Sequence, residues 1–251
     1  YPSKRFSLFD HFDPHRGSWQ QNSKYQESID VFDNEEHMGY FMQGANILIA
    51  ADGTWPRKAI WKPLVDNCQI VIACDGAIVQ LLQNDIIPDY VIGDLDSIPS
   101  EIIESQIKSL DITVIPMLNQ NSSDLSKALK YCQNLTAKRI DVIGVEGGRL
   151  DHQIGAYFSL CEQNSNAILH LDEWSIRLVM EEGLTIDSIE KGKNISLFAI
   201  GSVEDVNISG VKWPLIMKQL TAGTNGLHNE STGEKIQVSH SGGDLLLLVE
   251  R

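Results

Sequence analysis

The stretch PDYVIGDLDSI, residues 88–98, places an apolar run directly before two aspartates that are one residue apart. Side chains at positions i and i+2 of an extended chain point the same way, so Asp94 and Asp96 can present two carboxylates to one point. Carboxylates this close repel each other unless a cation lies between them or one of them binds a proton. A cation site is one interpretation of the stretch, and a polar turn before a helix is the other.

Short Val- and Ile-rich runs lie on both sides of this stretch. Nearly continuous apolar runs are typical of strands that are covered on both faces, as in a parallel sheet. Between the runs, apolar residues recur at helical spacing in 123–134 and in 150–163, where Leu150, Ile154 and Phe158 share one face. This alternation predicts an α/β, doubly wound parallel-sheet domain. Its strands are expected at 45–51, 69–74, 90–93, 112–115 and 139–145.

The pattern changes near residue 165. Helical periodicity fades, and short strand-like runs separated by Gly, Ser, Asn and Asp follow, which predicts a C-terminal all-β sandwich domain. Residues 1–44 are polar, dotted with aromatic residues, and show no clear period. We therefore expect an N-terminal extension (1–44), an α/β domain (45–165) and a β-sandwich domain (166–251).

The composition narrows the function classes. The net charge is −14 and the pI is near 4.8, which argues against nucleic acid and anionic membranes as partners. If the substrate is a nucleotide, a divalent metal must supply much of the neutralising charge. The four cysteines form no CxxC pair, and we expect them to be reduced core residues of a cytoplasmic protein. No apolar run approaches the ~20 residues of a membrane span, and the charged start of the chain is unlike a signal peptide.

Polar clusters follow four of the predicted strands, and each cluster contains an aspartate. In a doubly wound sheet, ligands bind at the carboxyl ends of the strands. Asp75 ends the strand at 69–74, and the pair Asp94 and Asp96 follows the strand at 90–93. The other two clusters are NQNSSD (119–124) and EGGRLDH (146–152).

The helix start within 119–129 combines Ser123, Asp124 and Lys127. Free N–H groups at a helix start bind anions, so one interpretation is a phosphate site in which Lys127 adds charge and Asp124 is a third metal carboxylate. The alternative is structural: Ser122 or Ser123 caps the helix, and Asp124 forms a plain surface pair with Lys127. In the last cluster, Arg149 offers a planar fork for phosphate oxygens.

Five motifs, in this order, resemble the thiamin pyrophosphokinase family. They are GDLDS (93–97), NQNSSDLSKAL (119–129), GGRLDH (147–152), VKWPL (211–215) and GLHNE (226–230). The resemblance covers roughly residues 45–251 and implies a homodimer, in which each chain has an α/β domain followed by a β-sandwich. It also implies Mg²⁺-dependent transfer of pyrophosphate from ATP to thiamine, giving thiamine diphosphate and AMP.

The resemblance implies roles for single residues. Asp94, Asp96 and Asp124 correspond to magnesium ligands, and together with Arg149 and Asp151 they form the expected catalytic set. We expect thiamine to be bound in the β domain, near the site of a partner subunit, by Trp213, His228 and Asn229. ATP and its phosphates are expected to contact Asp75, Gln120, Ser123, Lys127 and Arg149.

Two alternatives stay open: one rests on departures from the family pattern, and the other on the likeness of VIGDLDSI (91–98) to the motif of another family. Asn119 stands where the family usually has Asp, and His228 replaces a Ser, which motivates the alternative of an inactive thiamine- or nucleotide-binding homologue. The other alternative is a haloacid-dehalogenase-type phosphatase with Asp94 as nucleophile and Asp96 as acid/base. That family carries its motif on the first strand, whereas two predicted strands precede the motif here.

Overall fold

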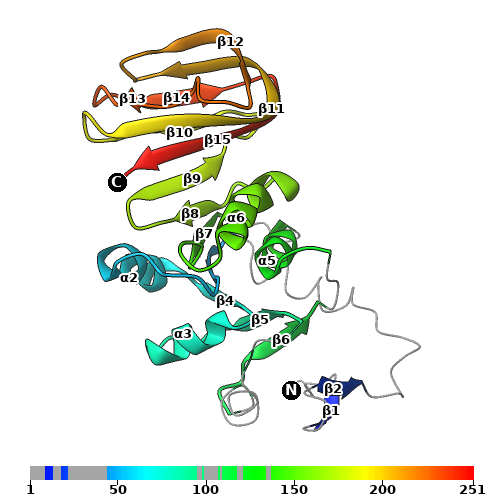
Figure 1. Ribbon diagram of the computed structural model, residues 1–251. Coiled ribbons are helices and arrows are strands. Elements are labelled where there is room, and N and C mark those ends of the chain that lie inside the picture. The colour runs from blue at the N-terminus through cyan, green and yellow to red at the C-terminus, as the bar shows by residue number, and fades with distance from the viewer. Residues whose placement is uncertain are drawn as a thin grey trace.

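The computed structural model describes residues 44–94, 98, 107, 109–117, 121–133 and 137–251, together with two short strands before them. These strands, β1 (Phe9–Asp13) and β2 (Ser18–Gln21), pair antiparallel. Asp96, Asn119 and Gln120 lie outside the described residues. Figure 1 shows an α/β part, which holds β3 to β8, and an all-strand part at the other end of the described chain.

Five parallel strands form the centre of the α/β part. All of them coincide with the predicted apolar runs to within two residues, because strands buried on both faces have nearly continuous apolar sequences. In spatial order they are β7 (Arg139–Ile143), β3 (Asn46–Ala50), β4 (Ile70–Cys74), β5 (Tyr90–Gly93) and β6 (Thr113–Pro116).

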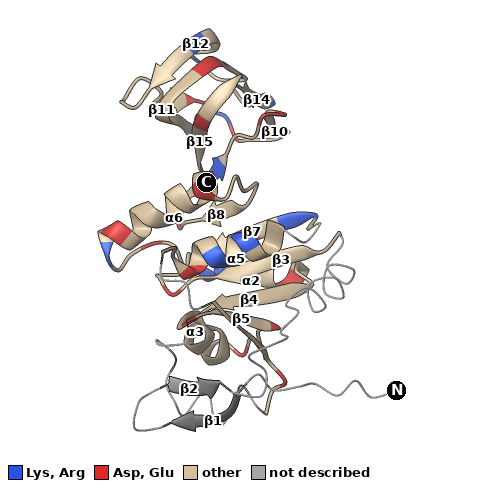
Figure 2. Cartoon of the chain, turned by 90° about the vertical axis from the view of Figure 1, so that its right-hand side faces the viewer, with Lys and Arg blue, Asp and Glu red and all other residues tan. Residues whose placement is uncertain are grey.

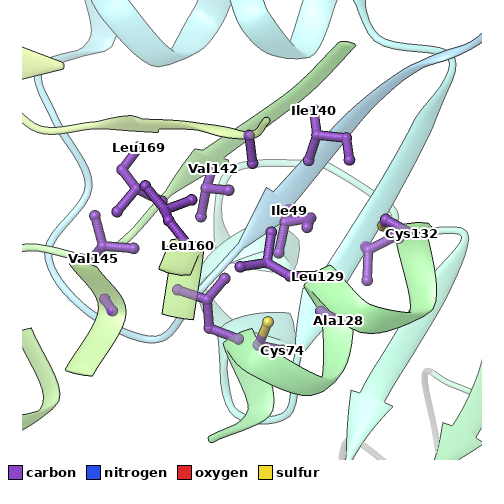
Figure 3. Packing of buried hydrophobic residues seen from close by; sticks show 14 of the residues in the cluster. Ile49, Cys74, Ala128, Leu129, Cys132, Ile140, Val142, Val145, Leu160 and Leu169 are labelled. Carbon is purple, nitrogen blue, oxygen red and sulfur yellow. The ribbon is translucent and has the colours of Figure 1, made fainter. Parts of the chain in front are cut away.

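Helices cover both faces of this parallel sheet. The side chains of β3 alternate between two cores: Ile47 and Ile49 pack on one face, and Leu48 and Ala50 pack on the other. Figure 3 shows Ile49 among residues of the first core, with side chains from two helices and the neighbouring strands around it. The first face is covered by α5 (Asp124–Gln133) and α6 (Leu150–Glu162), and the second by α2 (Lys58–Asn67) and α3 (Ala77–Gln83). The predicted α/β class is therefore confirmed.

The sheet continues without a break into the C-terminal part. β8 (Ile168–His170) pairs parallel with β7, and β9 (Trp174–Leu178) then pairs antiparallel with β8. β15 (Gly242–Glu250) joins β9 to the long strand β11 (Asn194–Ser209). Among the described residues, thirteen strands belong to this one sheet. The prediction placed β8 after the domain boundary, whereas it extends the parallel sheet; the division into domains stays a prediction.

The long strand β11 serves two layers of the C-terminal part. It pairs with β15 through residues 195–204, and with β12 (Leu215–Thr221) through residues 202–208. A third apolar core lies among these strands and includes Ile195, Val206 and Leu247. The remaining strands are β10 (Leu184–Ile186), β13 (Asn229–Glu230) and β14 (Ile236–Ser239).

The helix α6 forms where it was predicted, but its apolar stripe points outward. Leu150, Ile154 and Phe158 are exposed, whereas Ala156 and Leu160 are buried against the sheet. Helical spacing identifies a shared face, but it does not say which face the sheet covers.

The state of the cysteines, the distribution of acidic residues and the character of the helices can be compared with what the sequence predicts. The four cysteines are free thiols, and burial raises the pKa of the Cys132 thiol to about 12. In Figure 2, acidic positions are spread over both parts of the chain. No described helix has the length and apolar character needed to cross a membrane.

Candidate functional site

Three carboxylates meet at the carboxyl ends of β4 and β5. Asp75 follows β4, Asp94 follows β5, and Asp124 begins α5. One carboxylate oxygen from each residue lies within 4.8 Å of those of the other two. The structure therefore brings Asp94 and Asp124 together, and their role as metal ligands stays a prediction. We call these three residues the carboxylate cluster.

Asp75 belongs to the carboxylate cluster, whereas it was predicted only to contact ATP and its phosphates. The signal was present, since β4 and β5 are neighbouring parallel strands and both end in an aspartate. Asp75 is buried and has a φ of 37°, a left-handed conformation that is uncommon outside glycine. Residues held in such conformations gather at functional sites.

Gly93 makes the room in which the cluster forms. A Cβ atom on this residue would lie 2.8 Å from Asp75 Cβ and 3.4 Å from Asp124 Cγ. Since two carboxylate side chains pass directly over the Gly93 backbone, any larger residue would push them apart. The glycine of the GDLDS motif is therefore explained by space for the carboxylates.

The first turn of α5 joins the cluster to a buried cation. The Ser126 N–H donates to Ser123 Oγ at 3.2 Å, so Ser123 caps the helix as the structural interpretation predicted. Lys127 Nζ donates to Asp124 Oδ1 at 2.8 Å. The Lys127 side chain is only 6% exposed, so the interpretation of this contact as a plain surface pair is wrong.

The chemistry of the cluster fits a hard divalent cation. Three carboxylates and the ammonium group of Lys127 are gathered at this point. Burial, followed by the charge of Asp124, raises the pKa of the adjacent Cys74 thiol well above its usual range, so this thiol stays neutral. Carboxylate oxygens are the ligands that Mg²⁺ takes from proteins.

Arg149 and Asp151 form a separate, exposed pair at the start of α6. Arg149 Nη2 lies 2.6 Å from Asp151 Oδ2, and Arg149 Nε donates to Asp151 Oδ1 at 3.1 Å. The hydrogen bond from Arg149 holds the pKa of the Asp151 carboxyl below its ordinary value. Both residues of the pair are accessible to a ligand.

Trp213 and Asn229, the predicted thiamine residues, meet in the β part. The Trp213 N–H donates to Asn229 Oδ1 at 3.0 Å, and Asn229 Nδ2 donates to the Trp213 carbonyl at 2.6 Å. Both line a small cavity of about 130 Å³ that reaches the core residues Ile195 and Leu197. His228, with a φ of 60°, is not among the lining residues. Lys212 Nζ lies 4.5 Å from the centroid of the half-exposed Trp213 ring.

The cavity and the carboxylate cluster lie far apart within one chain. β12 and β13 both pair with β11, and six strand-to-strand steps separate β11 from β4. Each step in a sheet is about 4.8 Å. Figures 1 and 2 both show β12 in the all-strand part, far from β4 and β5 in the α/β part.

Comparison with protein families gives two adjacent matches. The model described as "Thiamin pyrophosphokinase, catalytic domain" matches residues 61–170, and "Thiamin pyrophosphokinase, vitamin B1 binding domain" matches residues 183–243. The chain belongs to the thiamin pyrophosphokinase family. The first match contains the carboxylate cluster, and the second contains Trp213 and Asn229.

Similar proteins of the thiamin pyrophosphokinase family come from plants and bacteria. Thiamine pyrophosphokinase 2 of Arabidopsis thaliana is 26% identical over 177 residues, which cover 66% of each chain. The chain therefore matches just under two thirds of that relative's length. Thiamine pyrophosphokinase of Bacillus subtilis is 25% identical over 188 residues, covering 73% of this chain and 88% of the relative.

Solved structures of the thiamin pyrophosphokinase family share the fold. The crystal structure of thiamine pyrophosphokinase from Bacillus subtilis matches with a TM-score of 0.68 and 23% identity, covering 82% of this chain and 98% of the other. The crystal structure of yeast thiamin pyrophosphokinase matches with a TM-score of 0.65 and 18% identity, covering 82% and 86%. At these identities, the likeness shows the fold alone.

Proposed function

We propose that this chain catalyses the Mg²⁺-dependent transfer of a pyrophosphoryl group from ATP to thiamine, giving thiamine diphosphate and AMP. The carboxylate cluster at the ends of β4 and β5 carries this proposal, because a chain of the thiamin pyrophosphokinase family here presents a ligand set suited to a metal that binds phosphate. The free thiols fit the cytoplasmic location that we expect.

The residues of the α/β part would position ATP. Asp75, Asp94 and Asp124 would hold Mg²⁺, with Asp96 as the fourth candidate ligand. When bound, the ion would neutralise charge on the phosphate oxygens, which is the main requirement of phosphoryl chemistry. Lys127 orients the Asp124 carboxylate through its buried ion pair. Arg149 offers further N–H donors to phosphate from its exposed position.

The residues of the β part would bind thiamine. The half-exposed ring of Trp213 offers a face that attracts the cationic thiazolium. Lys212 now lies over that ring and is also paired with Glu230, so it can turn away towards the carboxylate when thiamine binds. Asn229 uses its amide to fix the Trp213 backbone, so we assign it the role of positioning Trp213.

The separation of the two sites favours a homodimer. Six strand steps of about 4.8 Å exceed the length of a thiamine molecule, so the thiamine residues that complete one active site would come from a second copy. The chain also exposes apolar side chains that a second copy would cover. They are Leu150, Ile154 and Phe158 on α6, and Ile216 and Met217 on β12.

The reaction is tested by incubating the protein with thiamine, ATP and Mg²⁺, with and without EDTA. We expect thiamine diphosphate and AMP to appear in equal amounts, and EDTA to abolish both. ADP or phosphate without thiamine diphosphate would contradict the proposal and favour hydrolysis. Thiamine binding without any nucleotide turnover would favour the inactive homologue.

The shared site is tested by mixing two inactive variants, Asp124→Asn and Trp213→Ala. In a mixed dimer one site receives both substitutions and the other receives neither, so random re-association should restore about a quarter of the wild-type activity. Two preparations of Asp124→Asn mixed under the same conditions serve as the control. If each chain carries a complete site, the mixture will stay inactive.

A further inference from the structure

A polar row divides two apolar cores on the face of the sheet that α2 and α3 cover. On this face, one core includes Leu48 of β3, and the C-terminal core includes Leu247 of β15. The strand register places Asp141 of β7, Ile168 of β8 and Arg177 of β9 side by side between them. Charged residues thus interrupt an otherwise apolar face.

Arginines are concentrated around this row. Residues 44–251 contain five arginines, and four of them, Arg57, Arg139, Arg177 and Arg251, lie on or beside it. We call these four, with Asp141 and His170, the arginine seam. Such a concentration is unexpected in a chain whose net charge is −14.

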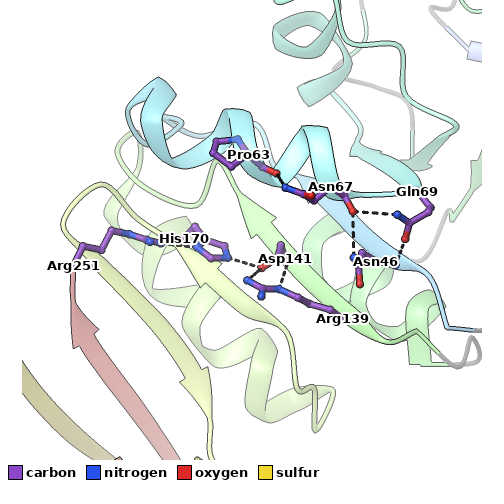
Figure 4. A network of polar contacts seen from close by, with 8 residues as sticks. All are labelled: Asn46, Pro63, Asn67, Gln69, Arg139, Asp141, His170 and Arg251. Atoms are coloured by element: carbon purple, nitrogen blue, oxygen red, sulfur yellow. Dashed lines mark hydrogen bonds and ion pairs between the residues drawn. The ribbon is translucent and has the colours of Figure 1, made fainter. Parts of the chain in front are cut away.

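The hydrogen bonds within the seam leave His170 neutral. Arg139 Nε and Nη2 donate to both oxygens of Asp141 at 2.7 and 2.9 Å, and His170 Nε2 lies 2.6 Å from Asp141 Oδ1. Arg251 Nη2 lies 2.5 Å from His170 Nδ1. Because a guanidinium can only donate, Nδ1 is the acceptor and the ring proton lies on Nε2, facing Asp141. Figure 4 shows this chain of contacts.

Arg177 differs from the other arginines of the seam. Arg57 is paired with Asp172 and Glu173, at 3.1 and 2.9 Å. Arg177 makes no hydrogen bond or ion pair with any residue that the structure describes, and its Nε atom is buried without a partner. Burial and then the charge of Arg139 lower the pKa of Arg177. A buried polar group without a partner is unfavourable unless a water or an ion satisfies it.

We propose that the arginine seam binds a small tetrahedral oxyanion, such as inorganic phosphate, between Arg177, Arg139 and Arg251. The four guanidinium groups of the seam face the carboxylates of Asp141, Asp172 and Glu173, so one positive charge is left over while His170 is neutral. Planar guanidinium forks match the oxygen geometry of such anions. The site lies on the sheet face between two cores, away from the strand ends that carry the carboxylate cluster, and it does not depend on the proposed reaction.

The test is a calorimetric titration with inorganic phosphate in EDTA, at constant ionic strength set with sodium chloride. EDTA removes metal-dependent phosphate binding at the carboxylate cluster. We expect saturable binding to the wild type, and at least tenfold weaker binding to Arg177→Met, because charged hydrogen bonds are lost. Lys235→Met, which removes an exposed cation that is paired with Asp187 in the β part, is the matched control and should bind phosphate like the wild type.

Thermal unfolding separates this site from a purely structural role of Arg177. Without phosphate, Arg177→Met should be at least as stable as the wild type, because no hydrogen bond is removed. Phosphate should raise the Tm of the wild type and of Lys235→Met, but not that of Arg177→Met. If Arg177→Met does not fold, the exposed Arg139→Met is tested instead. Equal phosphate binding in the seam and control variants, or none in the wild type, would overturn the proposal.

Discussion

The carboxylate cluster and the arginine seam are two regions of one sheet that gather charges of opposite sign. The cluster brings three carboxylates together beside Lys127, and the seam brings four guanidinium groups together beside Asp141, Asp172 and Glu173. The cluster lies where strands end, whereas the seam lies on strand residues between two cores. Strand ends are easily recognised in a sequence, but charges within strands depend on which distant strands become neighbours. The two regions therefore differ in how far a sequence reveals them.

Substitution of Asp124 by Asn should have the largest effect. The change keeps the shape of the side chain but removes one charge from the cluster, and it should lower thiamine diphosphate formation by roughly 1,000-fold. The measurement is the initial rate at saturating ATP and Mg²⁺. Asp187→Asn, at an exposed position paired with Lys235, is the control and should retain the wild-type rate. Comparable losses in both variants would refute a special role for the cluster.

Two glycine substitutions test the space that the cluster needs. Gly93→Ala places a Cβ 2.8 Å from Asp75 Cβ and should destabilise the fold by about 1–3 kcal/mol. Gly155→Ala, within α6, meets nothing within 4 Å and should stabilise the fold by about 0.5–1 kcal/mol. Denaturant unfolding measures both. An unchanged stability in Gly93→Ala would mean that the carboxylates can be arranged without this space.

Lys127→Met tests whether the buried ammonium group of Lys127 supplies positive charge that a metal ion could supply in its place. In EDTA the free energy of unfolding of the variant should be lower by about 1–3 kcal/mol. This is less than the cost of breaking a fully buried ion pair, because solvent screens the partly exposed Asp124 carboxylate. Mg²⁺ should raise the Tm of the variant more than that of the wild type, since the ion replaces the lost charge. Lys130→Met, on the exposed side of the same helix, should respond to Mg²⁺ like the wild type. An equal Mg²⁺ response in all three proteins would contradict this role.

The smallest effect is expected from the acid sensitivity of His170. Burial lowers the pKa of His170 below 6.5, against the opposing effect of Asp141; Arg251 and Arg139 also lower it. The unfolded chain therefore binds this proton more readily than the folded chain. The contribution to stability is full above pH 6.5 and is lost as the pH falls below that value, by up to ~1.4 kcal/mol per pH unit.

Unfolding free energies measured between pH 7.5 and 5 check this prediction. His170→Gln should be less stable at pH 7.5, but it should lose less stability on acidification than the wild type. His152→Gln, on the exposed start of α6, should keep the wild-type slope. If His170→Gln also keeps the wild-type slope, His170 is not the acid-sensitive group.

The sequence predicts the parallel strands, because they are nearly continuous apolar runs, and it predicts that Asp94 and Asp124 lie near each other, because one follows a strand and the other begins the helix after the next strand. It does not predict β10, β12 or β13, which are short or largely exposed and carry no clear alternation. The burial of Lys127 and the outward stripe of α6 depend on how helices dock. Arg177 and Asp141 lie in one row only because β8 stands between their strands, so local sequence gives no sign that they are near each other.

The unbroken sheet has a consequence for motion. The strands β7, β8, β9 and β15 connect the two parts through continuous backbone hydrogen bonds. A hinge between the parts would have to rupture one of these ladders, so domain closure is not available as a way to capture a substrate. The continuous sheet therefore favours a constant orientation of the two parts.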